Sequence, residues 1–198
     1  MSDAFISCAL HEVRRGFAFL MVDTGLHLQP ETLTEAVARR AKARLKELAT
    51  ILRRLIVLIA LGLALAPLKP RARTAPEREG DGIVTKSQPP YSFGLGGQMQ
   101  VYSLDGPDFP ETASRASGPV PAAPLMRRIA ALIRILRNPD RYATRVARLL
   151  ERRRMAGEPR PLCAPMEATW RLHPELGIVA AGLPHMLARA FDRWNDTG

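Results

Sequence analysis

One uncharged stretch constrains this chain more than any other feature. Residues 55–68 read LIVLIALGLALAPL and contain no formally charged side chain, while two arginines directly precede them and three basic residues follow within five positions. Such a segment has to be buried, either in a lipid bilayer or in a protein core, because exposing that much apolar surface to water is costly. Where the segment lies therefore determines where the protein resides.

The apolar run is short for a transmembrane helix, which needs about 20 apolar residues. Counted from Ile51 to the residue before Pro67, a helix would reach about 24 Å, against about 30 Å of hydrocarbon. It could span only where the bilayer thins or a partner helix helps. Yet the run is apolar on every side, unlike a surface helix of a soluble bundle. We expect segment 51–68 to contact lipid, with a buried core helix as the alternative. The expected membrane residues are Leu55, Ile56, Val57, Leu58, Ile59, Leu61, Leu63 and Leu65.

Residues 1–66 predict an antiparallel helical hairpin. Apolar residues recur at alternating spacings of four and three from Ile6 to Leu20, as on one side of a helix, and Thr24-Gly25 offers a stop. Thr32 and Glu35 have the spacing of a capping box, and a second apolar pattern then continues to Pro67. The second helix would be about 50 Å long and the first about 30 Å. The first helix therefore cannot cover the end of its partner, which is the apolar run.

Residues 67–124 predict a largely extended, disordered linker, because ten of the seventeen prolines and seven of the fourteen glycines fall there. Residues 125–198 predict a bundle of short helices. One helix should cover 125–137, break at Asn138-Pro139, and be followed by another that ends near Met155. A last helix is expected to begin at Pro184. Its apolar side should hold Leu183, Leu187, Phe191 and Trp194.

The chain is strongly basic, with a net charge of +10. This balance favours negatively charged partners, namely nucleic acid, anionic lipid or an acidic protein. Only four of the 29 basic residues are lysine, and arginine suits phosphate through its planar fork of donors. A coding sequence biased toward arginine and alanine is the alternative explanation.

Six arginines recur at spacings of three or four in the C-terminal region and predict a cationic helical face. They are Arg134, Arg137, Arg141, Arg145, Arg148 and Arg152. A basic amphipathic helix is typical of binding to an anionic membrane surface or to an acidic groove. The same residues could neutralise nucleic-acid phosphates, although Tyr142 is the one aromatic residue beside them and no nucleic-acid-binding motif occurs. A solvated face of a helical bundle is the simplest alternative.

No catalytic, cofactor-binding or metal-binding pattern stands out. The sequence lacks H-E-x-x-H, a P-loop and G-x-S-x-G. Cys163, His173 and His185 are spaced at ten and twelve, unlike a standard ligand set. Two distant cysteines cannot make a disulfide framework. We therefore expect no catalytic residue, cofactor or metal site, and no small-molecule substrate.

These patterns predict a mainly α protein with a helical hairpin (1–66), a Pro/Gly-rich linker (67–124) and a basic C-terminal bundle of short helices (125–198). We expect a non-enzymatic accessory or scaffolding protein at the inner (cytoplasmic) membrane, with anionic lipid or a helical protein as its partner. The alternative is a soluble, cytoplasmic protein that binds nucleic acid or an acidic protein.

Overall fold

The computed structural model describes residues 3–64, 118–166, 169 and 172–194. Within these ranges the chain is mainly helical, as expected, with an N-terminal helix pair and a set of C-terminal helices. Most of the predicted linker lies outside the described residues, and so does the segment 65–68 at the end of the apolar run.

Helices α1 (Asp3–Asp23) and α2 (Glu35–Gly62) form the predicted hairpin. Helix α1 ends where the sequence indicated, because Gly25 adopts the left-handed conformation (φ 67°) that favours glycine. The Thr24 hydroxyl donates to the carbonyl of Leu20 at 2.6 Å and closes the last turn. A 3-10 turn, η1 (Leu26–Leu28), then places Leu26 in the core.

The prediction for both ends of α2 was wrong. Thr32 does not cap the helix, because it belongs to strand β1 (Thr32–Leu33), which pairs with β2 (Val120–Pro121) in an antiparallel ladder. Thr34 is the N-cap instead, and its hydroxyl accepts the N–H of Val37 at 3.4 Å. At the other end, the backbone turns extended at Leu63, so α2 has 28 residues instead of about 35.

The C-terminal helices are α3 (Ala123–Arg137), α4 (Pro139–Met155) and α5 (Pro174–Ala190), followed by the 3-10 turn η3 (Asp192–Trp194). The break at Asn138-Pro139 and the end at Met155 are as predicted. The predicted start of the last helix was wrong: α5 begins at Pro174, and Pro184 lies inside it. The helix continues through Pro184 because Leu183 and Leu187, on either side of it, are buried in the core.

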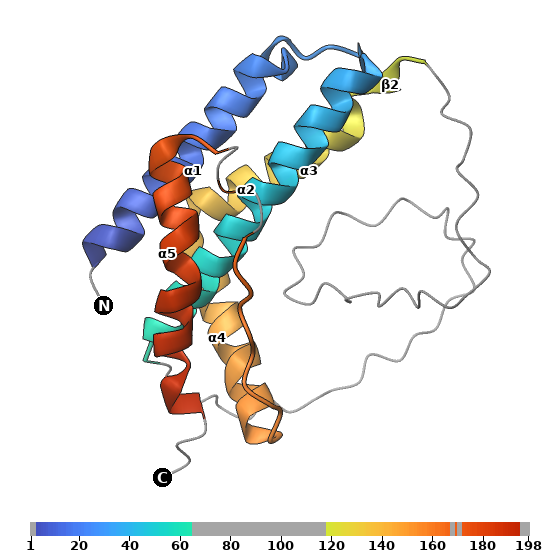
Figure 1. Ribbon diagram of the computed structural model, residues 1–198. Coiled ribbons are helices and arrows are strands. Elements are labelled where there is room, and N and C mark those ends of the chain that lie inside the picture. The colour runs from blue at the N-terminus through green and yellow to red at the C-terminus, as the bar shows by residue number, and fades with distance from the viewer. Residues whose placement is uncertain (1–2, 65–117, 167–168, 170–171, 195–198) are drawn as a thin grey trace, which may run out of the picture.

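Helix α2 is the centre of the fold. It contacts α1, α3, α4 and α5, and α5 lies in front of it in Figure 1 while α3 and α4 lie behind. The buried apolar residues of all five helices form one core. Two hydrogen bonds join distant segments: the Arg14 guanidinium donates to the carbonyl of Leu136 at 3.1 Å, and the Trp194 indole donates to the carbonyl of Glu158 at 3.0 Å. The apolar run therefore belongs to a helix with neighbours on several sides.

Candidate functional site

The apolar run is packed inside the protein wherever it is described. Leu55, Ile56 and Leu58 are fully buried. Val57, Ile59 and Leu61 are partly buried against the same core, and Leu63, at 37% exposure, lies just past the helix end. Leu65 lies outside the described residues.

The helices that cover the run come from the far end of the chain. Ala60 and Leu61 line a hollow of about 340 Å³ together with Leu150 on α4 and Phe191 and Trp194 after α5. We expected this end of α2 to be uncovered because α1 is too short to reach it. The C-terminal helices cover it instead. A helix can be apolar on every side when it is surrounded by other helices. Among the described residues, no helix combines the length and apolar composition that crossing a membrane requires.

The six arginines of the predicted cationic face are all exposed. We call them the arginine face: Arg134 and Arg137 on α3, and Arg141, Arg145, Arg148 and Arg152 on α4. Their apolar counterparts on the opposite sides of both helices, such as Ile129, Leu132, Val146 and Leu150, are buried in the core around α2. Both helices thus turn their basic side to solvent and their apolar side inward.

Within the described ranges, the arginine face has few partners. Arg152 donates from Nε to the carbonyl of Arg148 at 3.3 Å, and the Arg145 guanidinium lies 5.8 Å from the ring centre of Tyr142. In the described part of the chain, none of the six forms an ion pair. No described acidic side chain therefore neutralises these charges.

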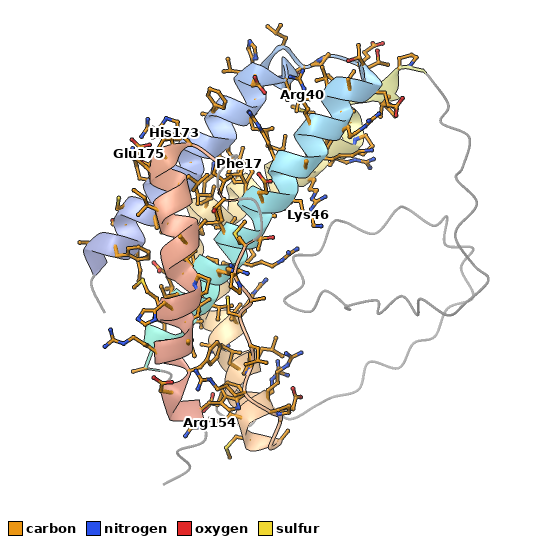
Figure 2. The ribbon with its side chains drawn as sticks, in the orientation of Figure 1. Phe17, Arg40, Lys46, Arg154, His173 and Glu175 are labelled. Carbon is orange, nitrogen blue, oxygen red and sulfur yellow. The ribbon has the colours of Figure 1, made fainter. Side chains whose placement is uncertain are left out.

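Charge is divided unequally among the helices. Helices α2, α3 and α4 contain 17 arginines and lysines against four acidic residues, whereas α1 and α5 contain three against four. Arg40 and Lys46 on α2 are both exposed, and Figure 2 shows Lys46 on the side of α2 away from α1. The basic character predicted for the C-terminal region thus extends to the central helix, while the α1–α5 side is nearly neutral.

The neutral side contains a groove that the sequence did not reveal. It has a volume of about 630 Å³ and lies between α1, α2 and the start of α5. Its apolar wall includes Phe19 and Val22, which are 60% and 64% exposed, and Leu48 and Leu176. Its polar residues include Glu12, Arg15, Arg44 and His173. Sequence spacing could not predict this groove, because its walls combine residues that are up to 164 positions apart.

The charged and polar groups of the groove are paired with one another or with neighbouring residues. Glu12 is only 8% exposed, and Arg15 Nη1 lies 3.1 Å from both of its carboxylate oxygens. Arg44 pairs with Asp23 at 3.0 Å and lies over the ring of Phe19. At the start of α5, His173 Nδ1 contacts the carboxylate of Glu175, and Figure 2 shows these two residues beside α1.

Comparison of this chain with family models, with curated proteins and with solved structures finds no match. The function therefore has to be inferred from the chain's own residues.

Proposed function

We propose that this chain is a non-enzymatic accessory protein that binds nucleic acid by its phosphates, through the arginine face of α3 and α4. One observation carries the proposal: six exposed arginines stand at helical spacing, and none is neutralised by an ion pair in the described part of the chain. A basic helical protein with this kind of partner was the alternative that the sequence left open.

Arginine suits this role because its guanidinium binds a phosphate through two parallel hydrogen bonds. From Arg134 to Arg152, the arginine face extends up to about 27 Å, the length of about eight base pairs of duplex. The excess charge on α2 extends the positive field beyond the face itself and favours the encounter with a polyanion.

A membrane surface was the first expectation from the sequence, and the packing makes it the second candidate. An interfacial helix inserts its apolar side between lipids, whereas the apolar sides of α3 and α4 already pack against the protein core. Attachment to a bilayer would then rest on charge, at about 1 kcal/mol for each basic residue near the surface. Met155, 81% exposed at the end of α4, and Leu162, 94% exposed in the segment that follows, are apolar residues that favour this candidate.

Binding should depend on charge and not on base sequence. Tyr142 is half-buried and lies against Arg145, so it offers no free ring for a base to stack on. Contacts to phosphate position a protein without reading sequence. We therefore expect similar affinity for unrelated duplexes and a steep loss of affinity with added salt.

The test measures binding of the protein to two kinds of anionic ligand. Fluorescence anisotropy follows binding to labelled duplexes of two unrelated sequences, and co-sedimentation follows binding to vesicles that contain phosphatidylserine. Changing Arg141, Arg145 and Arg148 together to Gln should weaken duplex binding. The plot of log binding constant against log salt concentration should also become less steep, by about 0.9 for each phosphate that the variant no longer neutralises. A matched variant with the same reduction in charge changes Arg39, Arg40 and Lys42 to Gln at the start of α2, and its affinity should fall less.

Each outcome points to one interpretation. Equal reductions in affinity for the two triple variants would mean that net charge, and not the arginine face, drives binding. Recruitment to vesicles without duplex binding would select the membrane candidate. Binding to neither would identify the face as a solvated surface, and the proposal would be wrong.

A further inference from the structure

Three potential metal ligands from distant parts of the chain converge at the edge of the groove. They are Glu12 on α1, His173 directly before α5, and Glu175 in the first turn of α5. One ligand atom from each lies within 4.8 Å of the other two. The fold brings them together, because Glu12 and His173 are 161 positions apart in the sequence.

Helix packing fixes Glu12 at this place. It lies on the inner side of α1, where Ala9, Val13 and Gly16 also face the core. Gly16 lets α5 approach closely, since a Cβ at that position would lie 3.3 Å from Cδ2 of Leu176. A carboxylate that is 8% exposed is costly to bury, and Arg15 offsets part of its charge.

The two ligands at the start of α5 are accessible. The side chains of His173 and Glu175 are 57% and 53% exposed, so both can adjust their position.

We propose that Glu12, His173 and Glu175 bind one divalent transition-metal ion of the zinc class. One imidazole nitrogen with two carboxylate oxygens is a donor set for zinc, whereas magnesium and calcium take oxygen ligands in larger number. Zinc–ligand bonds of about 2.0–2.2 Å require the contact between His173 and Glu175 to open so that the ion can lie between them, which the exposure of both side chains allows.

The surroundings fit such a site in two further respects. Glu12 has two oxygens, so one can bind the ion while Arg15 keeps its hydrogen bond to the other and orients the carboxylate. Three protein ligands leave a fourth coordination position for water. Because Glu12 and His173 also line the groove, that position is next to its open volume of about 630 Å³. The bound ion would join α1 to α5.

The experiment uses the full chain without a histidine tag, freed of metal by a chelator that is then dialysed away. Isothermal titration with zinc chloride should give one site per chain, and zinc should raise the Tm because it binds the folded state. Magnesium chloride at the same concentration should do neither. His173→Ala and Glu175→Gln, two changes at exposed positions, should each weaken zinc binding by at least about tenfold.

A matched control is His185→Ala, which removes an exposed histidine from the same helix and should bind zinc like the unmodified chain. Circular dichroism of each metal-free variant checks that folding is intact. The proposal is overturned if the unmodified chain binds no zinc at millimolar concentration. It is also overturned if the His173 and Glu175 variants bind as tightly as the control, since other histidines or cysteines would then be the ligands.

Discussion

Gly16 on α1 lies so close to Leu48 on α2 that a Cβ at position 16 would come within 2.7 Å of Cδ2 of Leu48. Leu48 is 3% exposed, but it also lines the groove, so its methyl group has some room to turn aside. The contact between these two residues therefore sets how closely the hairpin helices pack.

Gly16→Val should lower the free energy of unfolding by about 1–3 kcal/mol, because a branched side chain overpacks the contacts with Leu48 and Leu176. Gly16→Ala should lower the free energy of unfolding less, because alanine favours a helix over glycine by about 1 kcal/mol and this gain offsets part of the clash. Urea denaturation measures both. Gly182→Ala is the control: it is also in a helix, nothing lies within 4 Å of its added Cβ, and it should stabilise by up to about 1 kcal/mol. If Gly16→Val is as stable as the unmodified chain, the helices do not pack this tightly.

The start of α2 gives a second prediction. Thr34→Ala should destabilise the protein by about 0.5–1 kcal/mol, because the N–H of Val37 loses its acceptor. Thr32→Ala should have a smaller effect, since Thr32 is an exposed residue of the short ladder. Thermal unfolding of the two variants side by side measures the difference. The reverse order would restore Thr32 as the cap.

The sequence was informative about helices and poorly informative about what covers them. The spacing of apolar residues placed α1 correctly, and Asn138-Pro139 and Gly157 placed the break after α3 and the end of α4, because these features depend on neighbours along the chain. The capping position failed because Thr32 pairs with Pro121, 89 positions away. A local signal cannot report such a contact.

The described part of the apolar run should behave as a protein core. Leu55→Ala should cost about 2–5 kcal/mol, the usual effect of a cavity at a fully buried leucine. Leu63→Ala, at a position that is 37% exposed beyond the helix end, should cost well under half as much. Denaturant unfolding of the purified protein gives both values. Similar small decreases in stability for the two variants would show that Leu55 is not in a packed core.

The candidate sites were predictable to different degrees for the same physical reason. The residues of the arginine face recur at helical spacing within two consecutive helices, so the sequence identified them. They are exposed because the opposite, apolar sides of the same helices pack into the core. The groove and the Glu12–His173–Glu175 cluster depend on α5 returning to α1. Their residues carry no motif, and His173 alone is typical of a polar residue at a helix start.

The two cysteines should differ in reactivity. Burial raises the pKa of the Cys163 thiol, and the nearby charge of Arg54 offsets only part of this effect. Because the thiolate is the reactive form, Cys163 should react with iodoacetamide more slowly than the exposed Cys8 at pH 7–8. Its rate should continue to rise at higher pH, where more of the thiol ionises. Mass spectrometry of peptides from timed samples follows each site, and denatured protein, in which the two sites should react at similar rates, is the control. Equally fast labelling of both cysteines in the folded chain would show that the segment around Cys163 does not stay packed near Arg54.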